Sequence, residues 1–164
     1  MKGDQIADPT HKLTRYARAG LVDRKPNGDI YVTGAAFKWT KSGDHVLGLS
    51  VNWLHYFAGT QTEQLKAVRA AMHMTASASA RLALLEVGRT TDVLGDRANL
   101  AISVVQDPSP ADHRYPNEDP SHAAIAGLPD AGVDDQQSDL VGDLIAKYCV
   151  LENVPARESR PAKP

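Results

Sequence analysis

The chain has 164 residues, of which 42% are hydrophobic and 23% charged, and its formal net charge is −2. This length predicts one domain, and the balanced charge argues against a dedicated nucleic-acid binder. A single cysteine excludes an internal disulfide framework, and no apolar run approaches the ~20 residues that span a bilayer. We therefore expect a cytoplasmic protein without a membrane anchor.

The two ends of the chain are predicted to flank the folded domain. Residues 1–12 are polar and contain an Asp-Pro step, which indicates a loose arm or an edge segment. Residues 153–164 contain three prolines and little that is apolar. Such a segment buries too little surface to offset the entropy of ordering, so a disordered C-terminal tail is predicted. A globular domain is expected over residues 13–152.

The predicted strands are short. Asn-Gly in residues 25–29 tolerates positive φ and predicts a turn before the first strand. Five strands are predicted, over residues 30–33, 46–51, 82–87, 100–105 and 122–128. The first two are candidates for neighbours in a sheet, although the chain between them is too long for a tight hairpin. Residues 106–121 contain four prolines and are predicted to form a long loop.

Two main helices are predicted. Thr60 and Glu63 have the spacing of a capping box, so a helix is expected to begin there and run to about Thr75. Its apolar stripe contains Leu65, Val68 and Met72. Asp139 is expected to cap the second helix, whose apolar face contains Leu140, Val141, Leu144, Ile145 and Tyr148. Residues 148–151 either end this helix or form a last strand. Helices and strands do not alternate regularly, so the predicted fold class is α+β.

Two stretches carry a resemblance to known proteins. The first combines Ala36-Phe37 with Leu49-Ser50-Val51, and the second is DPSHAAIAGLP at residues 119–129. Together they resemble a group of small uncharacterised bacterial proteins that share an "AF…LSV" segment and a "DPxHAxIxGLP"-like segment. The resemblance implies a bacterial cytosolic origin and no particular chemistry. Small bacterial proteins of this kind are often encoded beside defence or toxin–antitoxin genes, so it also implies membership of such a multi-gene system.

The densest polar cluster lies at residues 112–122. His122 is a candidate general base or acid, with Asp119 to orient its ring and Arg114 to clamp an anion. An alternative interpretation is a solvated loop in which Asp119 bonds to backbone N–H groups. A metal site of His113, Asp119 and His122 has no recognisable ligand spacing, so we expect neither a metal nor a cofactor.

A second catalytic hypothesis joins distant parts of the chain. Arg15 would bind the phosphate of a nucleotide or NAD-like substrate, Glu86 would be a candidate acid, and His122 would transfer a proton. This rests on analogy with compact transferase folds. The glycines match no phosphate-binding loop, so a P-loop enzyme is excluded.

The aromatic residues gather in one stretch. Five lie within 21 residues: Phe37, Trp39, Trp53, Tyr56 and Phe57. Such side chains either build a core or dominate protein interfaces. Phe37, Trp39, Trp53 and Tyr56 are therefore candidate binding residues, and Trp39, which lies between lysines, is expected to be the most exposed.

The leading functional hypothesis is a non-enzymatic protein-interaction component that binds a protein partner or forms a homo-oligomer. The alternative is a small enzyme acting on a nucleotide or NAD-like substrate with His122 as general base or acid. A pocket joining Arg15, Glu86 and His122 would favour the enzyme, whereas an exposed patch around Trp39 would favour the interaction module.

Overall fold

A computed structural model describes residues 1–43, 45–72, 74–113 and 117–157. Within these ranges the chain forms eight strands and three α-helices, which confirms the α+β class and exceeds the predicted strand count. The strands are β1 (Lys12–Ala17), β2 (Val22–Arg24), β3 (Ile30–Val32), β4 (Leu49–Trp53), β5 (Arg81–Glu86), β6 (Ser103–Gln106), β7 (His122–Ala126) and β8 (Val150–Asn153). The α-helices are α1 (Gln61–Ala71), α2 (Val87–Ala98) and α3 (Asp135–Tyr148).

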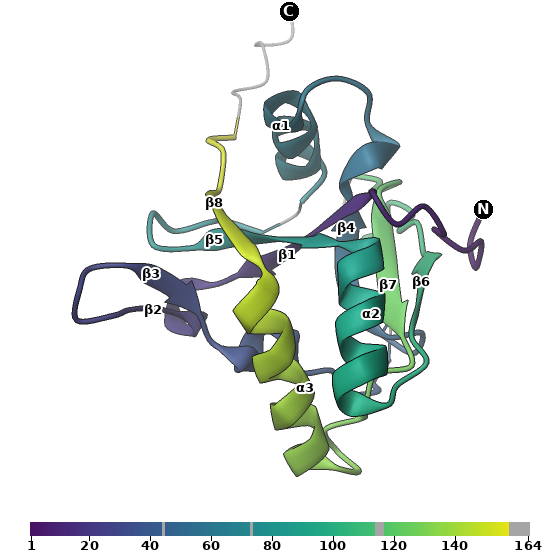
Figure 1. Ribbon diagram of the computed structural model, residues 1–164. Helices are drawn as coiled ribbons and strands as arrows, with labels where there is room; N and C mark the ends of the chain where they lie inside the picture. Colours follow the sequence, from purple (N-terminus) through teal and green to yellow (C-terminus); the bar gives the residue numbers. More distant parts are fainter. Residues whose placement is uncertain (44, 73, 114–116, 158–164) are drawn as a thin grey trace, which may run out of the picture.

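Six strands form an antiparallel sheet in the order β6-β7-β4-β1-β5-β8 (Figure 1). The remaining two, β2 and β3, pair as a separate hairpin that projects from one side of the molecule. Three short 3-10 helices complete the fold: η1 (Ala19–Leu21), η2 (Gly34–Phe37) and η3 (Leu54–Tyr56). Both β8 and the hairpin therefore present strand edges at the same end of the sheet.

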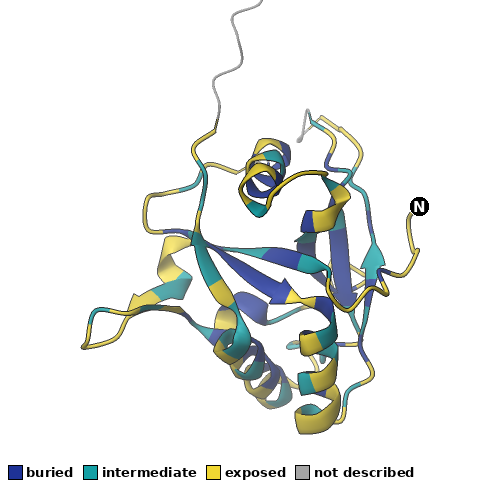
Figure 2. Ribbon diagram, turned by 45° about the horizontal axis from the view of Figure 1, so that its top comes forward, coloured by how far each residue is buried: buried dark blue, intermediate teal, exposed yellow. Residues whose placement is uncertain are grey.

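The helices cover the two faces of the sheet unequally. Because side chains alternate along a strand, Leu82 and Leu84 of β5 pack against α1, whereas Ala83 and Leu85 join the main core under α2 and α3. Figure 2 shows the buried residues concentrated in the sheet and on the helix faces turned toward it. Among the described residues, no helix combines the length and apolar character needed to cross a bilayer.

Several predicted elements are confirmed with shifted ends. The Thr60–Glu63 capping box forms as expected, and the α1 side chains of Leu65 and Val68 are buried. The second predicted helix begins earlier than expected: α3 has Asp134 as its N-cap, and Asp139 lies inside it. The Asp134 side chain accepts a hydrogen bond from the Gln137 N–H, so the extra turn is properly capped.

The predicted neighbour relation between the first two strands is wrong. β3 pairs with β2, which the sequence analysis did not predict, and β4 pairs with β1 and β7. The turn over residues 25–29 closes the β2–β3 hairpin, with Gly28 at φ 94° and the Lys25 N–H bonded to the Asp29 carbonyl. The turn thus forms where it was expected, but the strand before it, β2, was not predicted.

Both predicted flanking segments contribute residues to the folded domain. Ile6 is buried in the main core, and its N–H donates to the Val104 carbonyl of β6. Lys12 and Asn153, which the sequence analysis assigned to the flanking segments, are strand residues. Residues 158–164 of the predicted tail lie outside the described residues.

Candidate functional site

The residues of the second catalytic hypothesis are not brought together. Arg15 lies on the sheet face of Leu13 and Ala17, and its guanidinium donates to the carbonyls of Ala36 and Ser50 at 2.9 and 2.8 Å. His122 projects from the opposite face, because its neighbour Ala123 faces the main core. Burial lowers the pKa of Arg15 to about 10, so the residue stays charged and serves the packing of η2.

Glu86 is also remote from His122. Strands β4 and β1 lie between β7 and β5, so three strand spacings, roughly 14 Å, separate their two backbones. This distance exceeds the reach of a shared hydrogen bond. The pocket proposed to join Arg15, Glu86 and His122 therefore has no geometric basis.

Asp119 does not orient His122. Its carboxylate accepts hydrogen bonds from Asn52 Nδ2 and Ser121 Oγ, each at 2.7 Å, and from the Ser121 N–H at 3.1 Å. His122 instead has Nδ1 2.6 Å from the Asp107 carbonyl oxygen. A carbonyl only accepts, so Nδ1 carries the proton and His122 is tied to the loop before it. Asp119 is a structural group that joins this loop to β4.

Two further candidates come from the same loop cluster. Arg114 lies outside the described residues. His113 is described and exposed. Among the described residues, no group of three or more His, Cys, Asp or Glu side chains is arranged to hold a metal ion.

The aromatic residues divide between core and surface. Phe37 is 1% exposed and belongs to the main core. Trp39, expected to be the most exposed, is half-buried and donates from Nε1 to the His45 carbonyl at 2.8 Å. Tyr56 is 45% exposed and packs edge-on against the half-buried Trp53. Trp39 is therefore less exposed than expected, and Tyr56 is the most exposed of these five rings.

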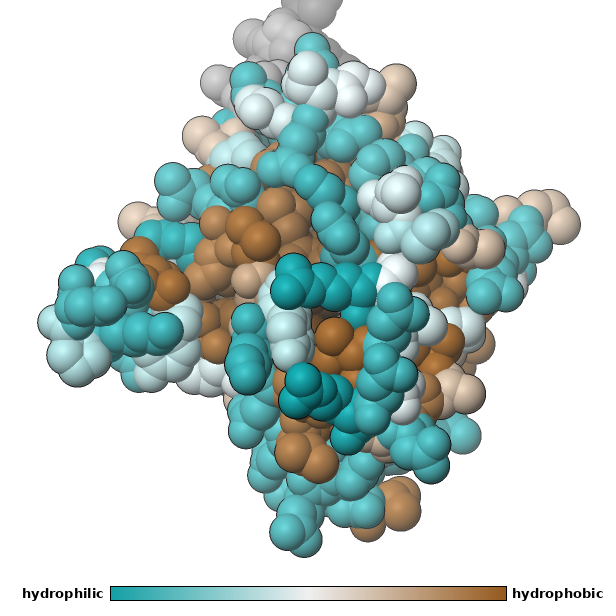
Figure 3. Space-filling view, in the orientation of Figure 1, coloured by the Kyte–Doolittle hydropathy of each residue, from teal (hydrophilic) through white to brown (hydrophobic). Residues whose placement is uncertain are grey.

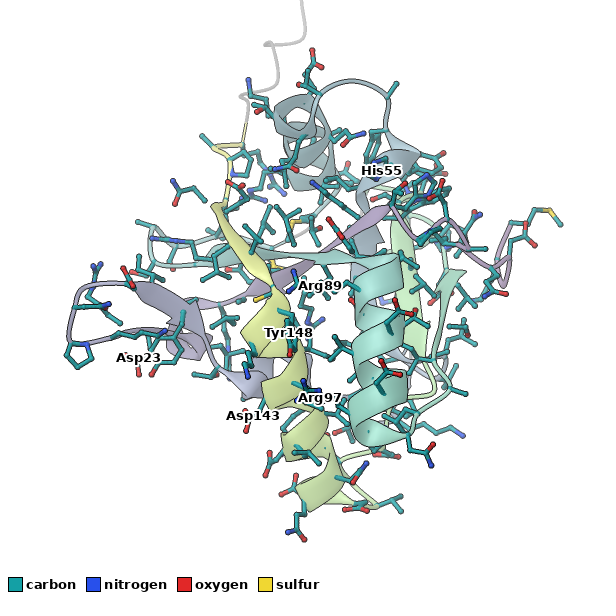
Figure 4. All side chains as sticks on the ribbon, viewed as in Figure 1. Asp23, His55, Arg89, Arg97, Asp143 and Tyr148 are labelled. Atoms are coloured by element: carbon teal, nitrogen blue, oxygen red, sulfur yellow. The ribbon has the colours of Figure 1, made fainter. Side chains whose placement is uncertain are left out.

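A stacked histidine pair borders this aromatic group, and Figure 4 labels one of its members, His55. The rings of His11 and His55 lie 4.6 Å apart at 14°. Trp53 Nε1 donates to His11 Nδ1 at 3.2 Å, and the Lys12 N–H donates to His55 Nδ1 at 3.0 Å. Both rings therefore accept at Nδ1 and carry their proton at Nε2. Burial, followed by the charges of His11 and Lys12, lowers the pKa of His55, while Asp8 opposes this shift.

We expect His55 to make folding sensitive to acid. Its folded-state pKa lies below the ordinary value, so its contribution to stability is complete above about pH 6.5 and is lost as the pH falls through the folded-state pKa. Urea unfolding at about pH 7 and pH 5 measures the change. His55→Asn keeps an acceptor but cannot protonate, so it should lose less stability than the wild type on acidification; an equal loss in both proteins contradicts this role.

A different part of the surface offers room for a ligand. A groove of about 750 Å³ lies between the β2–β3 hairpin and the end of α3, and we call it the hairpin groove. Its apolar lining comes mainly from Ile30, Val32, Ala146, Cys149 and Leu151. Figure 3 shows apolar surface over β8 with the hairpin beside it. The groove is open to solvent, so a ligand can enter it from outside.

Strand edges flank the hairpin groove. Among the residues that the structure describes, β8 is the last strand of the main sheet and β3 pairs with β2 alone. Leu151 of β8 and Ile30 of β3 both line the groove. An edge strand presents unpaired backbone N–H and C=O groups, which another extended chain can use. The groove thus combines an apolar floor with backbone hydrogen-bonding groups on its flanks.

The charged lining of the groove is mixed, with a positive excess. Lys25, Lys147 and Asp143 contribute to it, and Asp143 lies on the side of α3 toward the hairpin (Figure 4). Among the described residues, neither lysine forms a salt bridge. Burial raises the pKa of Cys149 to about 11, so this residue is a thiol at neutral pH and not a nucleophile. The groove is suited to binding rather than covalent chemistry.

The sequence analysis missed this groove because it missed β2. The signal was present: Val22 lies on the other side of the Lys25–Asp29 turn from Val32, and the two are register partners. A turn flanked by strand-forming residues on both sides predicts a hairpin there.

No known family model, no curated protein and no solved structure matches the chain.

Proposed function

We propose that this protein is a non-enzymatic interaction module that binds an extended segment of a partner protein in the hairpin groove. One observation carries the proposal: an apolar groove of about 750 Å³ flanked by the edges of β8 and β3. The aromatic residues predicted to bind are largely engaged with one another or with the core, which moves the expected interface to this groove. Membership of a defence or toxin–antitoxin system stays a prediction from the resemblance.

The proposed mode of binding is strand addition. The partner segment lies along a strand edge, so that backbone hydrogen bonds supply affinity and alternate side chains enter the apolar floor. Lys25 and Lys147 have no salt-bridge partner among the described residues, so the segment is expected to carry an acidic side chain at the rim. A partner with these properties is extended, apolar on one face and acidic on the other.

Peptides selected from a random displayed library test the proposal. We expect them to alternate apolar and polar residues and to include acidic ones. Ile30→Asp places a charge in the groove and should weaken their binding by about tenfold or more. Lys147→Glu, a surface change on α3, should weaken the acidic peptides in the same direction.

Val133→Asp is the matched control, because Val133 is 85% exposed and precedes the N-terminal end of α3, whereas Lys147 lies at the C-terminal end, about 18 Å along the helix from Asp135. It should leave peptide affinity unchanged. Equal affinities in wild type, Ile30→Asp and Lys147→Glu would remove the groove as the binding site. A dimer in the absence of peptide that dissociates in Ile30→Asp would identify a second copy of the chain as the occupant instead.

A further inference from the structure

A small pocket lies on the α1 face of the sheet, beside the end of β5, and we call it the Glu86 pocket. It has a volume of about 140 Å³, and its lining comes from β1, β5, β8 and all three α-helices. Leu84 and Val150, which are register partners in β5 and β8, supply apolar lining. Because side chains alternate along β8, Val150 lies on the opposite face from Leu151 of the hairpin groove. The two sites are therefore separate.

The lining of the Glu86 pocket carries charges of both signs. Lys12 and Arg89 are cationic, whereas Glu86 and Glu152 are anionic, so their formal charges cancel. Lys12 and Glu86 lie directly opposite each other in β1 and β5, where opposite charges attract. Lys12 Nζ instead donates to Gln61 Oε1 at 2.9 Å, and among the described residues it forms no salt bridge with Glu86. Both charged groups can therefore interact with a ligand.

Neighbouring groups orient the charged side chains of the lining. The Arg89 guanidinium carbon lies 4.9 Å from the centre of the Tyr148 ring, and Figure 4 shows these two side chains near each other between α2 and α3. A ring against the face of a guanidinium leaves the N–H donors at its edge uncovered. Gln61 Nε2 donates to Glu152 Oε1 at 3.4 Å, so Gln61 bonds to both Lys12 and Glu152. These contacts order the side chains in advance, which lowers the entropy cost of binding.

We propose that the Glu86 pocket binds a small zwitterion with one ammonium and one carboxylate group, as in a free α-amino acid. A carboxylate matches the paired N–H donors of Arg89, with Lys12 as a second donor. An ammonium group donates to carboxylates, which Glu86 and Glu152 provide. A ligand with charge of one sign leaves two like charges of the lining uncompensated, so the pocket selects against it.

The size of the pocket restricts the rest of the ligand. A cavity of about 150 Å³ holds a molecule of the size of benzene, so this pocket suits about six to eight non-hydrogen atoms, as in alanine or valine. Leu84 and Val150 provide the contact for a short apolar side chain. The site is independent of the proposed peptide binding, so the failure of one leaves the other standing.

Titration of the protein with L-valine at neutral pH and constant ionic strength tests the proposal. We expect a saturable rise in the thermal unfolding midpoint. Isobutylamine lacks only the carboxylate of valine and isovalerate lacks only its ammonium group, so each should bind at least about tenfold more weakly. Binding of either analogue as tightly as L-valine would contradict recognition of a zwitterion.

Two substitutions of exposed side chains test the roles of the two charges. Glu86→Gln should weaken L-valine binding about tenfold without weakening that of isovalerate. Arg89→Gln should weaken L-valine binding about as much without weakening that of isobutylamine. Asp96→Asn and Arg97→Gln change exposed residues of α2 outside the pocket, so these matched controls should bind L-valine as the wild type does.

A general stabilising effect of a small solute is not saturable and is the same in every variant. That result, or the lack of any saturable response of the wild type to L-valine and L-alanine, would overturn the proposal. Equal L-valine binding in wild type, Glu86→Gln and Arg89→Gln would overturn it as well. Ile30→Asp should bind L-valine as the wild type does, because Ile30 lines the hairpin groove and not the Glu86 pocket.

Discussion

Phe37→Ala is expected to lower the free energy of unfolding by about 3–5 kcal/mol, the largest single effect that we predict. The ring is 1% exposed and lies at the end of η2, in the core between the sheet and α3. Its removal combines the loss of buried apolar area with a cavity that a close-packed core cannot fill. Since a small domain is stable by about 5–15 kcal/mol, this loss is a large fraction of the total.

Tyr56→Ala is the matched control for this experiment. Tyr56 is 45% exposed and packs edge-on against Trp53, so its loss should cost about 1 kcal/mol, well below the cost of losing Phe37. Chemical denaturation of the three proteins provides the comparison. If Phe37→Ala unfolds at the same denaturant concentration as the wild type, then Phe37 is not a core residue, and the interpretation of it as a binding residue regains its basis.

The contrast between Phe37 and Tyr56 shows what the sequence pattern lacks. Both belong to the same aromatic cluster, and composition alone treats them alike. Phe37 lies in a 3-10 helix of four residues, which is too short for a helical or strand period to reveal its buried side. Only the contact between η2 and α3 determines that this ring points inward.

Two elements were missed because local propensity does not favour them. α2 contains Gly88 and Gly95 and the β-branched Thr90 and Thr91, all poor helix formers. In the structure both threonine hydroxyls donate to carbonyls one turn earlier, and Leu94 is buried in the core. β1 was missed for another reason. The charged Arg15 occupies an inward position between apolar residues, and its hydrogen bonds go to carbonyls that are far away in the sequence.

Strong local signals predicted their elements well. The capping box at Thr60 and Glu63 marks the start of α1, and the Asn-Gly turn closes a hairpin. The structural role of Asp119 was harder to predict from the sequence, because its hydrogen-bond partner Asn52 lies 67 positions away in the chain. The hairpin groove depends on a similar long-range arrangement, in which residues of β3 and α3 line the same space, so no local pattern shows it.

Gly142→Ala is expected to lower the free energy of unfolding by about 1–3 kcal/mol, although alanine is the better helix former. Gly142 lies within α3, where η2 crosses closely over it. A Cβ at Gly142 would lie 3.0 Å from the carbonyl carbon of Gly34 and closer still to its carbonyl oxygen. These are backbone atoms, so relief requires η2 to move away from α3.

Gly95→Ala is expected to change the free energy of unfolding in the opposite direction, and it serves as the matched control. Gly95 is also helical, but it is exposed, and the nearest atom to its new Cβ is the Leu100 carbonyl oxygen at 3.8 Å. This change should raise stability by about 0.5–1 kcal/mol. Because Gly34 also lines the hairpin groove, Gly142→Ala should weaken peptide binding while Gly95→Ala leaves it unchanged. Stabilisation by both substitutions would show that η2 does not approach α3 closely, and the groove would lose the contact that positions one of its walls.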